Sequence, residues 1–373
     1  MSGLPSRAGV VVAGGGVIGA SIAFHLAEAG VEGVLLVERA ELGSGSTGRG
    51  AGGVRAMFSD ELNVSIGVRS LERWGEFGER PGGEIDLARV GYLFLLDRPE
   101  DVSAFERDVA MQNRLGLPSR MLATAEAGEL SPLAGLDGVL GAAFCPLAGH
   151  ATPDATVQGY AAGARRHGAS IATRCEVTGV QTEDGAIAAV ETSRGTVATE
   201  ALVCAAGVGS AAIGAMAGVD LPVTAERRRI AYTGPIDGTP ERIPMTIDFA
   251  TGFYFHREGP GLLFGTNSTA EAETDWLEHA EPVIARRAPV LAEAPIAGGW
   301  SGLYEMSPDH NALIGEAAGP SRFLYATGFS GHGFQQAPAV GEIVRDLYLG
   351  REPFVDVSPL TVERAARPER NVV

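Results

Sequence analysis

Cysteine is scarce in this sequence, and its three cysteines, Cys145, Cys175 and Cys204, show no C-x-x-C spacing. An odd number of widely spaced cysteines argues against a disulfide framework and against a cysteine-based zinc site. The seven histidines are also scattered without the spacing of metal ligands. We therefore expect no bound metal, and a reducing compartment such as the cytoplasm.

Positive charge is also in short supply, because the formal net charge is −17. A chain without a basic stripe cannot release counterions from a phosphate backbone, so we expect no nucleic-acid partner. The densest basic run is Arg227-Arg228-Arg229. We interpret it as an exposed strand edge without a functional role.

Long uninterrupted hydrophobic runs are missing as well. Residues 1–9 lack the basic start and the cleavage pattern of a signal peptide. Residues 10–29 are apolar and contain the G-x-x-x-G spacing of packed membrane helices, but three consecutive glycines, His25 and Glu28 interrupt them. We expect no association with a membrane.

The sequence does have a globular composition that is rich in glycine. Hydrophobic residues make up 45% and charged residues 20%, with 52 glycines in 373 residues, which indicates a compact chain with many tight turns. This length is typical of two connected domains or of one large α/β domain.

The first 40 residues have the pattern of a βαβ unit. Residues 10–13 and 34–37 are short apolar runs typical of buried strands, and residues 17–29 fit a helix that ends at Gly30. Two parallel strands joined by a helix within about 30 residues require a right-handed crossover.

A G-x-G-x-x-G motif lies between the first strand and the helix. Gly14 would make the turn, Gly16 would let the backbone approach a pyrophosphate, and Gly19 would let the helix pack on the strand. The free amides at the helix N-terminus would then face the phosphates. Glu38 ends the second strand, where a carboxylate can accept the ribose hydroxyls. The unit predicts a dinucleotide-binding site.

Three later segments favour FAD over NAD, since a flavin dinucleotide is bound along its length by segments far apart in the chain. Residues 44–53 are mostly small and can lie against a ligand, residues 204–207 form a second glycine turn, and residues 327–333 open the last helix. A nicotinamide enzyme would require none of them.

The alternation of strands and helices breaks twice along the chain, which predicts a second domain. We expect an α/β fold with an α+β substrate domain, that is, a discontinuous Rossmann-like FAD-binding domain and an antiparallel-sheet substrate domain. The expected FAD-binding parts are residues 1–88, 143–222 and 301–373, and the expected substrate-domain parts are residues 89–142 and 223–300.

On these motifs the chain resembles the D-amino acid oxidase superfamily, and within it the branch of sarcosine oxidase and the dye-linked L-proline dehydrogenase β-subunit. The resemblance spans nearly the full length. The matching segments are residues 43–55, 58–63, 91–96 and 112–113, the sequence WSGLY at 300–304 and the sequence GFSGHGF at 328–334.

The resemblance implies noncovalent FAD, with the amide end of the last helix facing the N1 and C2 carbonyl region of the flavin. It implies a catalytic site made of Arg55 as the clamp for a substrate carboxylate, Tyr304 and His256 as cavity walls, and Gln335. The implied cofactor-binding residues are Gly14, Gly16, Val17, Ile18, Gly19, Glu38, Arg39, Ser46, Thr47, Arg49, Val177, Ala206, Gly207, Gly331, His332, Gly333, Phe334 and Gln335.

Three departures from the family pattern bear on the substrate and the electron acceptor. Gln335 stands where sarcosine oxidases place a carboxylate-binding lysine, so one positive charge is missing from the clamp. Leu263 falls near the place of the lysine that promotes reaction with oxygen in monomeric sarcosine oxidase, which favours a dehydrogenase. Gly302 replaces the flavin-linking cysteine of that enzyme.

The implied reaction is oxidation of the C–N bond of a small secondary or N-methylated amino acid, such as sarcosine or proline. A hydride passes to flavin N5, and the resulting imine hydrolyses. The electron acceptor is oxygen or another carrier. One alternative is a flavin-holding electron-relay subunit of a hetero-oligomeric dehydrogenase, with a second subunit as partner. Another is a divergent amine oxidase that acts on a larger biosynthetic amine.

Overall fold

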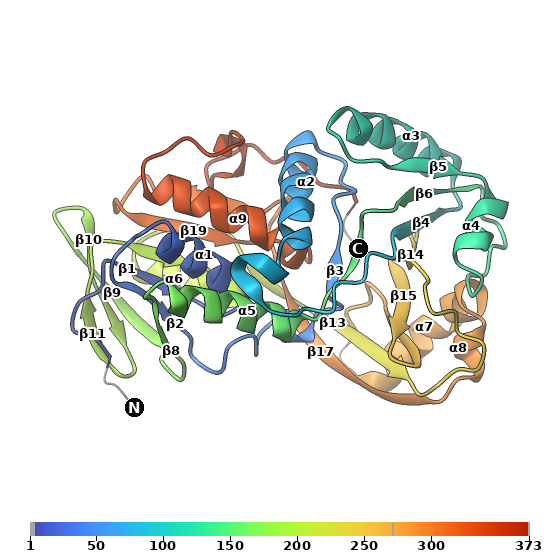
Figure 1. The fold of residues 1–373 in the computed structure, drawn as a ribbon, viewed down its shortest axis with the longest axis horizontal. Helices are drawn as coiled ribbons and strands as arrows, with labels where there is room; N and C mark the ends of the chain where they lie inside the picture. The colour runs from blue at the N-terminus through green and yellow to red at the C-terminus, as the bar shows by residue number, and fades with distance from the viewer. Residues whose placement is uncertain (1–3, 271, 372–373) are drawn as a thin grey trace.

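The computed structural model describes residues 4–270 and 272–371. Two large sheets lie side by side in the view of Figure 1, and helices pack on both of them. Residues 1–3, at the start of the segment that lacks a signal-peptide pattern, lie outside the described residues.

The first sheet has six strands in the order β18-β19-β12-β1-β2-β8. Its neighbours are parallel except for β18 and β19, which are antiparallel. Parallel strands are covered on both faces, which explains the uninterrupted apolar runs in the sequence. The strands are β1 (Val10–Ala13), β2 (Val34–Val37), β8 (Ser170–Ala172), β12 (Leu202–Cys204), β18 (Leu313–Glu316) and β19 (Phe323–Thr327).

Alternate residues of β1 show what covers each face of this sheet. Val10 and Val12 pack in the core that includes the helices, and Val11 and Ala13 pack in a second core on the opposite face. The helices on the first face are α1 (Val17–Glu28), α5 (Pro153–Arg166) and α9 (Gly333–Tyr348), with α2 (Glu61–Gly75) packed on α9. The second face carries α6 (Ser210–Met216) and a small sheet of β9 (Val177–Glu183), β10 (Ala186–Thr192) and β11 (Gly195–Ala198). The predicted Rossmann-like architecture is confirmed.

The helix α1 lies within the apolar segment of residues 10–29, which has the G-x-x-x-G spacing of membrane helices. It contacts α5 and α9, and residues 17–27 are all buried. Throughout residues 4–270 and 272–371, no helix combines the length and the apolar character that crossing a bilayer requires.

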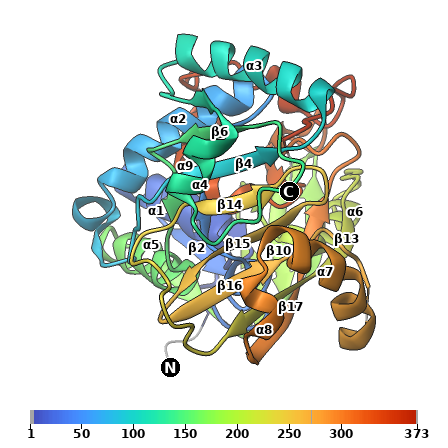
Figure 2. The ribbon, with the colours of Figure 1, turned by 90° about the vertical axis from the view of Figure 1, so that its right-hand side faces the viewer.

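The second sheet has eight strands in the order β17-β13-β16-β15-β14-β4-β6-β5, and only the β14–β4 pair is parallel. Figure 2 shows α7 and α8 in front of one part of the sheet and α3 along its upper edge. The strands are β4 (Tyr92–Leu96), β5 (Arg120–Leu122), β6 (Gly141–Cys145), β13 (Thr224–Thr233), β14 (Met245–Asp248), β15 (Phe253–Glu258), β16 (Gly261–Gly265) and β17 (Ile296–Met306). The helices are α3 (Pro99–Arg114), α4 (Thr124–Leu130), α7 (Glu273–Arg287) and α8 (Val290–Glu293).

The sheet differs from the sequence-based expectation in two respects. The predicted domain boundaries after residues 142 and 300 fall inside β6 and β17, so these two strands run past the expected borders. The basic run is not on a strand edge, because β13 lies between β17 and β16. Its middle residue, Arg228, is 15% exposed and lies against Tyr304.

The segment of residues 364–371 connects the two halves of the molecule. Arg364 pairs with Asp309, between β17 and β18, with an Nη2–Oδ1 distance of 2.5 Å. Arg370 pairs with Asp108 of α3 at 3.1 Å. The segment thereby joins the loop that leads into the six-stranded sheet to a helix of the other half.

Candidate active site

A channel of about 470 Å³ runs along the carboxyl ends of β1, β2 and β12. In open α/β sheets this edge is where ligands bind. The wall of the channel includes ten of the residues that were predicted to bind FAD: Gly14, Gly16, Ile18, Glu38, Arg39, Ser46, Arg49, Val177, Ala206 and Gly207.

The glycine motif at the floor of the channel has the geometry that its sequence predicted. Gly14 has a φ of +114°, and a Cβ at this position would lie 2.2 Å from the carbonyl oxygen of Ala205. A Cβ on Gly19 would lie 1.9 Å from the carbonyl oxygen of Gly14. Gly14 therefore makes the turn, and Gly19 lets α1 approach β1, so Gly19 supports the site without lining it.

The same turn offers a fit for the pyrophosphate and ribose of a dinucleotide. A Cβ on Gly16 would meet only the Thr47 hydroxyl, at 3.2 Å, so the backbone here is open toward the channel. The Thr47 hydroxyl accepts a bond from the Val17 amide at 3.1 Å, at the N-terminus of α1. Glu38 lies on the rim, where its carboxylate accepts from the Gly15 amide at 2.7 Å. An anion-binding turn and a carboxylate on one channel suit the adenosine and phosphate part of FAD.

Replacing Gly19 with alanine tests this arrangement. The added Cβ would force α1 away from β1, and overpacking of this kind costs roughly 1–3 kcal/mol. We expect FAD affinity to fall by about 5- to 150-fold, measured by fluorescence titration of the apoprotein. Gly78→Ala is the control, since a Cβ on Gly78 would have no atom within 4 Å. Equal FAD affinity in the two variants would contradict the assignment.

A second cavity of about 150 Å³ continues from the channel toward the eight-stranded sheet. Four residues line both spaces: Ile18, Ser46, Leu303 and Glu305. The second cavity also contains six of the remaining predicted cofactor residues, namely Val17, Thr47, Gly331, Gly333, Phe334 and Gln335. The two spaces together can therefore hold an elongated ligand that reaches from β2 to the start of α9.

Arg55 lies on the wall of this second cavity and is 5% exposed. Its Nη1 donates to the Met57 carbonyl at 2.9 Å and its Nη2 to the Asn371 carbonyl at 2.6 Å. Its guanidinium carbon lies 4.6 Å from the centre of the Phe58 ring. Burial lowers the pKa of Arg55, but a guanidinium stays charged at neutral pH.

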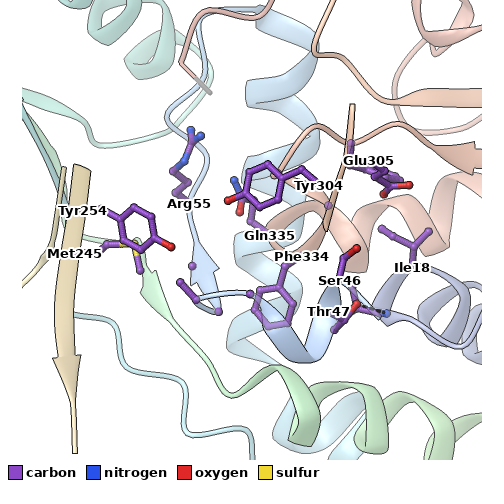
Figure 3. Close-up of a pocket in the computed structure, with 18 of the residues that line it drawn as sticks. Ile18, Ser46, Thr47, Arg55, Met245, Tyr254, Tyr304, Glu305, Phe334 and Gln335 are labelled. Atoms are coloured by element: carbon purple, nitrogen blue, oxygen red, sulfur yellow. Dashed lines mark hydrogen bonds between the residues drawn. The ribbon is translucent and has the colours of Figure 1, made fainter. Parts of the chain in front are cut away.

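Three tyrosines from different strands line the same cavity, Tyr92 from β4, Tyr254 from β15 and Tyr304 from β17. Figure 3 shows Tyr254 and Tyr304 reaching into the cavity from different strands, with Arg55 between them. Burial raises the pKa of each phenol, so all three are neutral at physiological pH. Aromatic rings, hydroxyls and one guanidinium suit a small ligand with an apolar body and an anionic group.

The N-terminus of α9 forms the wall opposite the channel's glycine turn. Gly331 has a φ of +91°, and a Cβ there would lie 2.3 Å from the Tyr304 ring, so glycine is required by both backbone and packing. Gln335 is 5% exposed, and its carbonyl accepts a bond from the Trp74 indole at 3.0 Å. Residues 333–335, the first residues of α9, thus line the cavity in which the flavin end of the cofactor is expected.

Two predicted histidines do not line either cavity. His256 is on the same face of β15 as Tyr254 but two residues farther along, and its ring lies 4.5 Å from the His150 ring. His332 is 1% exposed and packs 5.4 Å from the Phe58 ring. Burial lowers the pKa of both imidazoles to about 3, so both are neutral. His256 therefore lies behind the cavity wall that it was expected to form, and His332 supports the α9 loop from behind.

Several cavity residues were not found from the sequence, namely Tyr92, Met245, Tyr254 and Glu305. Tyr92 and Tyr254 lie in segments that were correctly predicted as strands, but strand periodicity does not say which face meets a ligand. Glu305 had a usable signal, because it is an acidic residue in a mostly apolar strand next to the predicted Tyr304.

The fold and the two joined cavities define a flavin-dependent oxidoreductase. The chain matches the protein family described as "DAO: FAD dependent oxidoreductase" over residues 9–347, and it belongs to that family. Its cofactor is FAD. The predicted superfamily, enzyme class and cofactor are thereby confirmed.

Individual relatives agree with this family. Mitochondrial dimethylglycine dehydrogenase of Mus musculus is 29% identical over 385 residues, which cover 96% of this chain and 44% of that protein. Sarcosine oxidase subunit beta of Rhizobium meliloti (strain 1021) is 27% identical over 371 residues, covering 96% of this chain and 88% of that protein. The crystal structure of L-proline dehydrogenase from P. horikoshii is 33% identical with a TM-score of 0.88, covering 94% of this chain and 95% of that one. The chain thus spans less than half of the length of the dimethylglycine dehydrogenase.

Proposed function

We propose that this protein oxidises the C–N bond of a small secondary or N-methylated amino acid. Bound FAD supplies the hydride acceptor. The substrate carbon loses a hydride and a C=N bond forms. A secondary amine also loses its N–H proton and becomes an imine, whereas a tertiary amine becomes an iminium ion. Water then adds to the carbon, a proton is released from that water where the iminium ion formed, and the original C–N bond breaks. The residues of this chain bind and orient the amino acid and exclude bulk water.

The observation that carries this proposal is the environment of the Arg55 guanidinium, which is buried and lacks a carboxylate in contact within the described part of the chain. Among the described residues no carboxylate lies within 4.0 Å of its guanidinium, although the side chain is 5% exposed. Within residues 4–270 and 272–371, two of its five N–H groups donate to carbonyls. Glu369 acts on Arg55 only from beyond this distance, where it opposes the lowering of the guanidinium pKa by burial. A buried cation without a counter-ion in contact is costly unless a ligand supplies the negative charge. A substrate carboxylate supplies it with the bidentate geometry that arginine favours.

The rest of the cavity restricts the size and the charge of the substrate. A space of about 150 Å³ must hold the amino acid and the reacting edge of the cofactor, so the substrate is small. Arg55 disfavours a second positive charge beside it, which favours the neutral form of the bound amine. A neutral amine is the form that can release a hydride from its adjacent carbon.

The names of the relatives support the same substrate class. Dimethylglycine and sarcosine carry N-methyl groups, and proline is a secondary amine, so the three share a substituted nitrogen next to a carboxylate. Arg55 and the tyrosine-lined cavity suit this common core. The proposal therefore extends to the class and leaves the individual amino acid to experiment.

An anaerobic screen tests the proposed function directly. The holoenzyme would be mixed with sarcosine, dimethylglycine, L-proline, glycine and larger N-alkyl amines, and the flavin absorbance at about 450 nm would be recorded. We expect at least one N-substituted amino acid to bleach the flavin and its decarboxylated counterpart not to do so. Bleaching by decarboxylated amines alone would reject the carboxylate clamp and favour the alternative of a larger biosynthetic amine.

We also propose that the electron acceptor is a carrier other than oxygen. The chain contains no lysine, so no lysine ammonium can stand beside the flavin. Leu263 lies on β16 opposite His256 and lines neither cavity. A lysine at that place would stabilise the negative charge that forms as oxygen is reduced, whereas Arg55, the cation of the cavity, is reserved for the substrate carboxylate. We therefore expect slow reoxidation of the reduced enzyme by oxygen and faster reoxidation by an artificial dye.

A second subunit is proposed as a partner because one relative is named as a subunit. The activity of the isolated chain distinguishes a catalytic chain that has a partner from a chain that only relays electrons. If the chain is only a relay subunit, the purified protein binds FAD but no amine bleaches it until a partner is added.

A further inference from the structure

Glu305 is a half-buried acid that lines the cofactor channel rather than the interior of a sheet. It follows Tyr304 on β17, and neighbouring residues on a strand point to opposite sides. In Figure 3 the Tyr304 ring lies toward Arg55, whereas the Glu305 carboxyl lies on the other side, near Ile18. One strand therefore places a phenol in the amine cavity and a carboxyl at the channel.

The carboxyl group is fixed by the end of β19. Its Oε2 accepts from the Thr327 hydroxyl at 2.8 Å and from the Gly328 amide at 3.2 Å. The Glu305 carbonyl accepts from the Ser330 amide at 2.9 Å. Two of these bonds hold the carboxyl group, and the third holds the backbone of Glu305 to the loop before α9.

Glu305 has no ion-pair partner within residues 4–270 and 272–371. Among the described residues, no arginine or histidine nitrogen lies within 4.0 Å of its oxygens. Burial raises the pKa of Glu305 to about 7, although the bonds from Thr327 and the loop amides act in the opposite direction. A carboxyl in this range can accept a hydrogen bond when ionised and donate one when protonated, which matches a hydroxyl group in both states.

The position along the channel identifies which part of FAD passes this residue. Four residues line both the channel and the amine cavity, and of these only Ser46 and Glu305 have polar side chains. The Ser46 hydroxyl donates to the Leu303 carbonyl at 2.5 Å. The phosphates belong at the glycine turn and the flavin ring at the start of α9, so the ribityl chain between them must cross here.

We propose that Glu305 is a further cofactor-binding residue, whose carboxyl group hydrogen-bonds ribityl hydroxyls of FAD where the cofactor passes from the channel into the amine cavity. The ribityl chain carries the only row of hydroxyls between the phosphates and the ring. This role concerns the cofactor alone and does not depend on the identity of the amine.

Affinity of the apoprotein for FAD provides the first test. Hydrogen bonds to a charged group are worth enough that Glu305→Ala is expected to weaken FAD binding by about 10- to 100-fold. Glu305→Gln keeps the shape and the oxygen to which Thr327 donates, and we expect a smaller loss. Glu106→Gln, on the exposed side of α3, is the matched control with unchanged affinity. Circular dichroism of each apoprotein shows that the variants are folded.

FAD analogues that lack the 2′, 3′ or 4′ ribityl hydroxyl provide the second test. In the parent protein at least one analogue should bind about tenfold more weakly than FAD, and in Glu305→Gln and Glu305→Ala this ratio should fall toward one. A carboxyl that only supports Thr327 would leave the ratio unchanged. The proposal is overturned if all three analogues show the same ratio in the parent and in both variants, or if Thr327→Val weakens FAD as much as Glu305→Ala does.

Discussion

Replacing Arg55 with alanine is expected to lower kcat/KM for the amino acid substrate by about 10²- to 10³-fold, while FAD stays bound. Truncating one partner of a buried charge pair costs roughly 2–5 kcal/mol, and each 1.4 kcal/mol is a factor of ten. FAD should remain because Arg55 lines the second cavity and not the channel. Steady-state kinetics on the substrate found in the anaerobic screen would measure the loss.

Arg55→Lys distinguishes a bidentate clamp from a simple positive charge. Lysine keeps the charge but loses the planar fork, so we expect an intermediate loss that falls mainly on KM. Arg98→Lys, at an exposed position before α3, serves as the control. Carboxylate inhibitors give an independent reading, since they should perturb the flavin spectrum of the parent but not of Arg55→Ala. An unchanged KM in Arg55→Ala would remove the basis for the carboxylate clamp.

The second large effect is expected on stability, at Arg287. Its Nε lies 2.6 Å from Asp248 at the end of β14, and its Nη2 lies 2.9 Å from Asp97, which follows β4. The side chains of Arg287 and Asp248 are 1% and 0% exposed. Removing one member of a buried ion pair leaves the other charge uncompensated and costs about 3–5 kcal/mol. Arg287→Ala should therefore lower the free energy of unfolding by that amount, measured by urea titration at saturating FAD.

Arg286 gives a control from the neighbouring position on α7. Its side chain is 39% exposed and lies 3.3 Å from Asp97 and 3.5 Å from Asp248. Exposed ion pairs are typically worth about 0–1 kcal/mol, so Arg286→Ala should have a small effect. If both variants lost the same stability, the buried pair would not be what holds α7 to the sheet.

The FAD half of the site could be predicted because its signals are local. Gly14, Gly19 and Glu38 fall within 25 consecutive residues, and a strand, a tight turn and a helix fix their relative positions without help from the rest of the chain. The same holds for the loop before α9. Each of these segments carries its own backbone requirement, and glycine at a positive φ makes that requirement visible in the sequence.

The amine cavity could be predicted only in part, because it is assembled by long-range packing. Tyr92 and Tyr254 lie far apart in the chain and reach one space only through the order of strands in the eight-stranded sheet. His256 is the opposite case, a residue that was expected in the cavity wall and does not line the cavity. It has the same orientation as Tyr254 on β15, but two residues of rise along the strand, roughly 7 Å, move it out of the cavity.

The positions of Tyr304 and Glu305 both depend on the pairing register between β13 and β17. Tyr304 pairs with Glu226 and Glu305 with Ala225 in the present register. A slip by one residue would exchange the faces of the whole strand, so the phenol would enter the cofactor side and the carboxyl would enter the space beside Arg55. The proposed roles of Tyr304 toward the amine and of Glu305 toward the cofactor therefore depend on the same register. An insertion or deletion in β17 should abolish both at once rather than convert one specificity into another.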